Sequence, residues 1–272
     1  MKIAYVGYDV FLTAFQMTLA CKCQVMKLFT FPVDGLTETN EKMKAVCEKN
    51  NIPWTEDRIT LEDLQQLKDD GCELLIVSGY PHKIPVLPGL RAVNIHPSPL
   101  PIGAGPWPWP VSILKDLPYS GVTIHVLTEE LDAGDILIQR AYRLTKDMTA
   151  RDMEVTFDRL SAELLRQLLA APDAFFEQAM PQLAGGGEYW PEPSEEEKIF
   201  SYTDPYDKID HIVRAFYGYG CTMKLPMGQV KILCARAMTA PVAAKPGEWI
   251  DEHHIAIPGG MLEIELSGEG LI

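Results

Sequence analysis

The sequence predicts an α/β protein with a mostly parallel, Rossmann-like sheet, followed by a smaller C-terminal domain that is rich in β-strands and barrel-like. Three observations predict this class. Apolar, strand-like stretches alternate with amphipathic, helix-like stretches as far as residue 171. A stretch rich in glycine, proline and glutamate interrupts the alternation at residues 183–198, as is typical of a linker. Short strand-like stretches punctuated by glycine and proline then follow. We therefore expect one domain at residues 1–182 and a second at residues 199–272.

The elements of the first domain are expected from their periodicity and their end signals. Buried strands are predicted at residues 2–8, 24–31, 72–80, 92–97, 121–127 and 136–144. Helices are predicted between or after them at residues 11–20, 39–51, 61–71 and 149–171. In the second domain, a helix is predicted at residues 207–220, and short strands are predicted within residues 223–238, 247–252, 254–258 and 261–266.

The composition excludes several classes of protein. The 272 residues are 47% hydrophobic and 23% charged, as in ordinary globular proteins. The net charge of −14, without a basic stretch, argues against a long nucleic-acid partner, because phosphate neutralisation needs clustered Lys and Arg. No apolar run reaches the roughly 18 residues of a membrane helix, and the N-terminus resembles a first strand rather than a signal peptide. Six cysteines without metal-ligand spacing indicate free thiols in the cytoplasm.

The stretch "NIHPSPLP" ends one of the predicted strands. Asn94 and His96 are two positions apart, so their side chains leave the strand on the same face, and Pro97 ends the strand. Ligands of open α/β sheets bind at the carboxyl ends of strands. Two interpretations stay open on these residues alone. Asn94 could cap a turn beside a hydrogen-bonded, partly buried His96, or the pair could face a ligand.

A second polar segment, "LTEELDAGDIL", follows a later strand. Asp132 and Asp135 flank a compact Ala-Gly turn that can direct one carboxylate inward. A carboxylate beside His96 would raise the pKa of that imidazole and keep it protonated near neutral pH. Asn94 and a protonated His96 would then form a pair of donors for a developing oxyanion. Spacing alone leaves the contact between Asp132 and His96 undetermined.

The order and spacing of "NIHPSPLP", Gly105, Pro108 and "GVTIHVLTEELDAGDIL" resemble the signature of the 10-formyltetrahydrofolate-dependent formyltransferases. That family includes enzymes acting on glycinamide ribonucleotide, methionyl-tRNA and amino sugars. The similarity is strongest from Leu74 to Leu144, and the region after residue 206 is similar to the C-terminal barrel of the methionyl-tRNA enzymes. The resemblance implies the formyltransferase fold and 10-formyltetrahydrofolate as co-substrate.

The resemblance also implies the roles of individual residues. The family's catalytic asparagine, histidine and aspartate match Asn94, His96 and Asp132. Its folate-binding loops, which act largely through backbone groups, match two segments of this chain. The residues expected to bind folate are therefore Tyr80, Pro81, His82, Lys83, Ile84, Leu127, Thr128, Glu129, Glu130 and Leu131.

Departures from the family pattern concern the acceptor. Ile102–Ala104 stand where relatives usually carry basic residues, and Trp107 and Trp109, which could pack on the sheet or contact substrate, follow them. The segment "FTFPVDGLTETNEK" is short and acidic where methionyl-tRNA enzymes insert a long basic loop. No G-x-G-x-x-G, Walker loop, HExxH or CxxC is present, so neither a nicotinamide cofactor nor a metal is expected.

The sequence therefore predicts transfer of a formyl group from 10-formyltetrahydrofolate to a primary amine of a small acceptor, such as an amino-sugar nucleotide or an amino-acid-like molecule. One alternative is a methionyl-tRNA formyltransferase that lacks the basic loop. Another is a hydrolase that releases formate from the same folate, because water could take the place of the amine. The C-terminal region could hold substrate, form a homodimer or cover the first domain.

Overall fold

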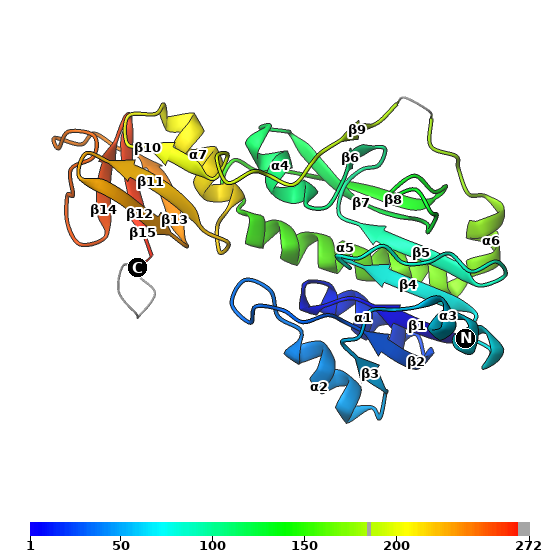
Figure 1. Ribbon diagram of the computed structural model, residues 1–272. Helices are drawn as coiled ribbons and strands as arrows, with labels where there is room; N and C mark the ends of the chain where they lie inside the picture. Colours follow the sequence, from blue (N-terminus) through cyan, green and yellow to red (C-terminus); the bar gives the residue numbers. More distant parts are fainter. Residues whose placement is uncertain (184–185, 266–272) are drawn as a thin grey trace. The chain divides into compact units, whose positions relative to one another are not determined.

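A seven-stranded sheet occupies the first part of the molecule (Figure 1). Its strands, in spatial order, are β3 (Trp54–Thr55), β2 (Gln24–Phe29), β1 (Lys2–Val6), β4 (Leu74–Ser78), β5 (Arg91–His96), β7 (Tyr119–Val126) and β8 (Ile136–Arg143). The neighbours from β3 to β5 pair in parallel, whereas β7 runs antiparallel to β5. The predicted mostly parallel sheet is confirmed.

The computed structural model describes residues 1–183 and 186–265, which fall into two compact units. Unit 1 consists of Met1–Pro106, Ser120–Tyr142 and Glu154–Trp190. Unit 2 consists of Trp107–Tyr119, Arg143–Met153 and the residues from Pro191 onward. The domain limits expected at residues 182 and 199 stay a prediction, and residues 184–185 and 266–272 of the predicted linker and second domain lie outside the described residues.

The central strand β4 shows why the sheet forms. All five of its residues, "LLIVS", are buried, as expected for a parallel strand covered on both faces. Leu75 and Val77 contribute to an apolar core cluster on one face, which also contains Leu64 and Leu67 of a helix. On the other face of the neighbouring strand, the ring of Tyr5 packs on a phenylalanine ring at 5.0 Å between centroids.

Helices cover both faces of this sheet. The helices of the chain are α1 (Leu12–Ala20), α2 (Glu41–Lys49), α3 (Leu61–Asp69), α4 (Pro108–Leu114), α5 (Ala150–Ala170), α6 (Pro172–Glu177) and α7 (Tyr206–Ala215), with a short 3₁₀ helix at Asp9–Phe11 before α1. Helix α3 begins with a capping box in which Thr60 and Asp63 exchange hydrogen bonds, so its start follows from local sequence.

Two other helices in unit 1 are capped by distant residues. Asp158 of α5 accepts hydrogen bonds from the backbone N–H groups of Thr13 and Ala14, each at 3.0 Å, at the start of α1. The carboxylate of Asp9 accepts hydrogen bonds from the backbone N–H groups of Lys42 and Met43 at the start of α2. These carboxylates satisfy N–H groups that no residue of the helix itself can satisfy.

Unit 2 contains two three-stranded sheets, in the orders β10-β11-β12 and β13-β15-β14. Their strands are β10 (Ile199–Ser201), β11 (Cys221–Leu225), β12 (Gly228–Ile232), β13 (Ala235–Thr239), β14 (His254–Ile257) and β15 (Gly260–Ile264). The predicted β-rich C-terminal region is therefore confirmed, in the form of two separate small sheets within the described residues. In the described part of the chain, no helix has the length and apolar character needed to cross a membrane.

Some predicted elements differ from the structure. The helix predicted at residues 207–220 ends at Ala215, because Gly218 and Gly220 adopt left-handed backbone conformations that a helix cannot contain. The strand predicted at residues 247–252 is absent, and only Trp249 forms a bridge, with Ile255. Helix α4 was not predicted. Its prolines are tolerated there because they lie in the first turn.

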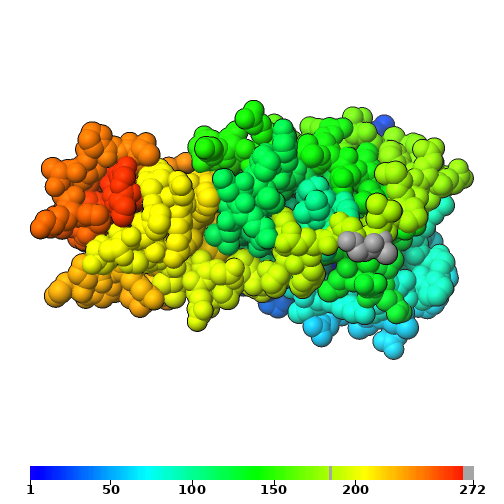
Figure 2. Space-filling model, turned by 90° about the horizontal axis from the view of Figure 1, so that it is seen from above, coloured from blue at the N-terminus to red at the C-terminus, as the bar shows by residue number. Residues whose placement is uncertain are grey.

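A short parallel pair of strands joins two loops of unit 1. Strand β6 (Ile102–Ala104) pairs with β9 (Glu188–Tyr189). In Figure 2, the yellow-green residues that follow residue 186 run along the surface of the molecule. This pairing anchors a segment that was predicted to be a linker.

We expect the Asp158→Ala substitution to destabilise unit 1 by about 1–3 kcal/mol, because two N–H groups of α1, one buried and one partly buried, lose their acceptor. The free energy of unfolding in urea measures this loss. Asp69→Ala is the matched control, since the carboxylate of Asp69 is exposed and accepts only from Gln65 of its own helix. Equal stability of the two variants would contradict the capping role of Asp158.

Candidate functional site

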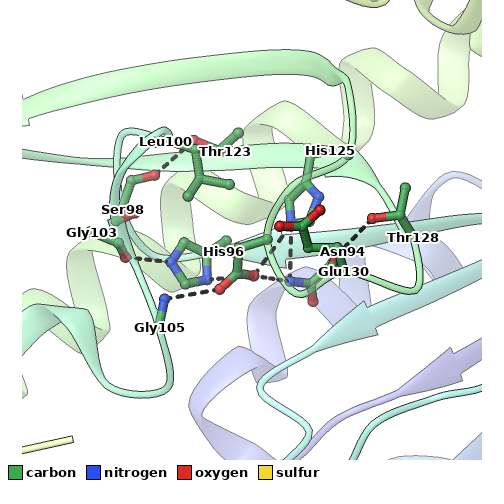
Figure 3. A network of polar contacts seen from close by, with 12 residues as sticks. Asn94, His96, Ser98, Leu100, Gly103, Gly105, Thr123, His125, Thr128 and Glu130 are labelled. Atoms are coloured by element: carbon green, nitrogen blue, oxygen red, sulfur yellow. Dashed lines mark hydrogen bonds and ion pairs between the residues drawn. The ribbon is translucent and has the colours of Figure 1, made fainter. Parts of the chain in front are cut away.

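The end of strand β5 carries two polar side chains on one face (Figure 3). Asn94 pairs in the ladder with Val77 of β4 and with His125 of β7, and His96 is the last residue of the strand. His96 is 5% exposed, whereas Asn94 is partly exposed. The sequence prediction that Pro97 ends the strand is confirmed.

The carboxylate of Asp132 lies at the centre of the polar network. Its Oδ1 atom is 3.4 Å from Nδ2 of Asn94 and 3.4 Å from Nδ1 of His96. Its Oδ2 atom accepts a hydrogen bond of 3.0 Å from the backbone N–H of Gly105. The structure therefore brings together the three side chains that the sequence singled out, all of them within unit 1.

His125 is a fourth member of the network, and the sequence analysis treated it only as a strand residue. Its Nδ1 donates to the carbonyl oxygen of Val126 at 3.0 Å, so Nε2 can accept from Nδ2 of Asn94 at 3.2 Å. The same Nε2 atom is 3.6 Å from Oδ1 of Asp132. The antiparallel register of β5 and β7 places His125 opposite Asn94, and the sequence did not reveal this register.

The loop after β5 holds the other side of His96. Nε2 of His96 donates to the carbonyl oxygen of Gly103 at 2.8 Å, which leaves Nδ1 directed at Asp132. Thr123 of β7 stabilises the loop, because its hydroxyl donates to the carbonyl of Ser98 at 2.7 Å and accepts from the N–H of Leu100 at 3.1 Å. The orientation of the imidazole is therefore set by backbone atoms on one side and a carboxylate on the other (Figure 3).

The protonation of His96 differs from the expectation. Burial lowers the pKa of His96, and this effect exceeds the opposing effects of Asp132 and of the Gly103 carbonyl. The predicted rise in the pKa of His96 is therefore wrong, and the ring is neutral near pH 7. Burial raises the pKa of Asp132, but His96, His125 and the Gly105 N–H lower it by more, so Asp132 is ionised. The sequence indicated Asp132 as the charged neighbour of His96, but it did not reveal how deeply His96 is buried.

The two loops expected to bind folate both pack against one buried core cluster. Tyr80 and Leu127 both pack against the core cluster beneath α3, and Ile84 is buried within it. The hydroxyl of Thr128 donates to the carbonyl of Glu130 at 2.7 Å, which shapes the second loop (Figure 3). Leu131 is 66% exposed. Pro81, Lys83, Glu129 and Glu130 are also exposed, His82 is partly exposed, and the roles of all these residues stay predictions.

The two tryptophans that follow Gly105 pack inside unit 2. Trp109 is buried, and the ring of Trp107 lies 4.8 Å from that of Tyr219 and 5.9 Å from that of Phe216, measured between centroids. Ring packing therefore accounts for both side chains. In residues 1–183 and 186–265, no three His, Cys, Asp or Glu side chains are arranged to hold a metal ion.

Comparison with known proteins gives consistent results. The family described as "Formyl transferase" matches residues 32–169, which confirms the resemblance found in the sequence. The methionyl-tRNA formyltransferase of Rickettsia bellii is 28% identical over 100% of this chain and 90% of its own length. That of Herpetosiphon aurantiacus is 28% identical over 97% of this chain and 92% of its own length.

Two solved structures share the fold. One is an N-formyltransferase from Helicobacter canadensis in complex with folinic acid and dTDP-3-aminofucose, with a TM-score of 0.69, 17% identity, and 97% and 98% of the two chains covered. The other is HypX from Aquifex aeolicus in complex with tetrahydrofolic acid, with a TM-score of 0.69 and 19% identity. That match covers 97% of this chain and 43% of HypX.

We expect the Asp132→Asn substitution to lower the pKa of His96 further, because the carboxylate at 3.4 Å stabilises the imidazolium ion. Titration of the imidazole C–H resonances by NMR measures this change. Asp135→Asn is the matched control, three residues away on the surface, and it should leave the titration unchanged. An unchanged or higher pKa of His96 in Asp132→Asn would show that Asp132 does not act on this ring.

Proposed function

This chain belongs to the formyl transferase family, whose pattern covers about half of it, and we propose that it transfers a formyl group from 10-formyltetrahydrofolate to a primary amine of a small acceptor. The observation that carries this proposal is the convergence of Asn94 and His96 on the ionised carboxylate of Asp132 at the end of β5. Ligand sites of open α/β sheets lie at such strand ends.

The residues around the two loops fit a folate. Tyr80 and Leu127, both partly buried, pack against the same core cluster, so the two loops lie close together, and their apolar side chains suit a flat pterin ring. At the first of these loops, Nη2 of Arg58 lies 2.9 Å from Nδ1 of His82, and both side chains reach solvent. A guanidinium group at this position suits the carboxylates of a glutamyl tail, because Arg binds carboxylates with paired donors. The segments Tyr80–Ile84 and Leu127–Leu131 would therefore hold the folate, which supplies the formyl group on its N10 atom.

Each side chain of the network has a role in this reaction. The amine nitrogen of the acceptor attacks the formyl carbon, the bond from that carbon to N10 breaks, and one proton moves from the amine to N10. When substrate binds, Asn94 can turn the Nδ2–H that faces Asp132 at 3.4 Å to the formyl oxygen, which gains negative charge in the transition state, and keep its other hydrogen on His125. Neutral His96 can take up the amine proton at Nδ1, where the Asp132 carboxylate stabilises the resulting charge.

The charge of the chain favours a small acceptor. The net charge is −14, and no Lys or Arg occurs between Thr30 and Glu41, where a basic loop would contact an RNA backbone. The structural similarity to an N-formyltransferase in complex with an amino-sugar nucleotide supports an acceptor of this class. A second candidate is methionyl-tRNA, because the methionyl-tRNA formyltransferase of Rickettsia bellii is 28% identical over 100% of this chain.

The acceptor can be identified with the purified protein and 10-formyltetrahydrofolate. We expect tetrahydrofolate to appear, and a formamide to form, when an amino-sugar nucleotide or an amino-acid-like amine is added. Methionyl-tRNA should react with a much lower kcat/KM, since the phosphate backbone meets no basic surface loop. Efficient formylation of methionyl-tRNA would replace the small-amine proposal with the second candidate. Rapid formate release without any acceptor would instead indicate hydrolysis.

We expect the Asp132→Asn substitution to reduce kcat by about 100-fold or more, because His96 loses the charge that stabilises its protonated form and Gly105 N–H loses a charged acceptor. Initial rates of formyl transfer at saturating substrates measure this effect. Asp135→Asn should retain wild-type kcat, and both variants should unfold cooperatively in urea, which shows that they are folded under the assay conditions. A catalytically normal Asp132→Asn protein would eliminate this mechanism.

A further inference from the structure

Two described stretches, Met180–Leu183 and Gly186–Trp190, contact the two halves of the site, although the second stretch was predicted to be part of a linker. Met180 and Ile136 exchange two backbone hydrogen bonds, of 2.8 and 2.9 Å, close to the Asp132 turn. In the second stretch, β9 pairs with β6 on the other side of the site. Gln182 belongs to the first stretch and Trp190 to the second.

Gln182 supports the turn that carries Asp132. Its Nε2 atom donates to the carbonyl oxygen of Asp132 at 2.7 Å and to that of Gly134 at 2.8 Å. Both hydrogens of one amide group are therefore used on this turn. Asp132 has a φ angle of 55°, in the left-handed region that few residues other than glycine adopt without cost. The two hydrogen bonds hold the backbone in the conformation that directs the carboxylate toward His96.

Trp190 supports the opposite loop. Its backbone N–H donates to the carbonyl of Ala104 at 2.7 Å, and its side chain is 2% exposed. A Cβ atom on Gly105 would lie 2.0 Å from the carbonyl oxygen of Trp190, so the two backbones approach closely. This loop supplies the Gly103 carbonyl to His96 and the Gly105 N–H to Asp132. Gln182 and Trp190 therefore contact the two elements that orient the His96 imidazole.

We propose that Gln182 is a positioning residue of this enzyme, which holds the Asp132 turn so that the carboxylate meets the His96 imidazole. The inference rests on the proposed function. Gln182 contacts the backbone of Asp132 and no reacting atom, so it acts through Asp132. Loss of its donors lets the turn relax toward other backbone conformations, and displacement of a catalytic group by about 1 Å can cost roughly 100-fold in rate.

The decisive variant is Gln182→Met, which keeps the length of the side chain and removes both donors. We expect kcat to fall by about 10- to 100-fold with KM for the folate and the amine within about twofold of wild type. Gln182→Ala should show the same fall in kcat and the same small change in KM as Gln182→Met. Gln167→Ala is the matched control, because Gln167 is also partly buried and donates to a backbone carbonyl, that of Glu163, within α5. The Gln167→Ala variant should retain wild-type kcat.

A pH profile separates positioning from general destabilisation. The titratable groups that act on His96 are Asp132 and His125. A carboxylate held less firmly near the imidazole stabilises its protonated form less, so the limb of the kcat profile that His96 sets should move to lower pH in Gln182→Met. In the pH profile of kcat for Gln167→Ala, the limb that His96 sets should coincide with that of the wild type.

The outcomes distinguish this inference from the proposed function. If the wild type transfers no formyl group to any amine, the proposed function fails. The NMR titration of His96 then tests Gln182 alone, and an unchanged pKa of His96 in Gln182→Met would show that Gln182 does not position Asp132. If the wild type is active, and Gln182→Met has normal kcat and an unmoved pH limb, the positioning role is wrong. A lower urea midpoint of Gln182→Met with unchanged kcat and pH limb assigns Gln182 a structural role only, and also overturns the proposal.

Discussion

One buried carboxylate, that of Asp132, connects the elements that form the site. It receives an N–H from the loop after β5, faces polar atoms of two neighbouring strands, and is carried by a turn with a left-handed backbone. A carboxylate with so few water neighbours is stable only when several donors surround it. The strand register, the loop at Gly103–Gly105 and the turn at Asp132 must therefore all be correct at once.

The same burial decides the chemical state of the site. His96 lies close to a carboxylate, and this contact favours the imidazolium ion, but its removal from water favours the neutral ring by more. A neutral imidazole next to an ionised carboxylate is suited to take up a proton during the reaction rather than to carry one beforehand. Entry of a substrate changes the solvation of this pair, so the balance between burial and charge is part of the mechanism under the proposed function.

The fold and the acceptor are determined by different parts of the chain. The sheet, the strand end and the Asp132 turn are compatible with formyl transfer to chemically different amines, since proteins that share the fold carry different names and partners. What differs in this chain is the surface: a short acidic segment after β2 and uncharged residues at Ile102–Ala104. These features argue for a small acceptor and leave the polar network unchanged.

The sequence by itself determined the alternation of strands and helices, the end of β5 at Pro97 and the start of α3 at its capping box, because each depends on neighbouring residues. It also identified Asn94, His96 and Asp132 as residue types able to form a site. Only the tertiary structure decided that His125 faces Asn94, that Gln182 supports Asp132, and that burial keeps His96 neutral. These facts depend on the antiparallel pairing of β5 with β7, on contacts across up to 50 residues of chain and on exclusion of water. The local sequence reveals neither the strand pairing, nor the contacts between distant residues, nor the exclusion of water.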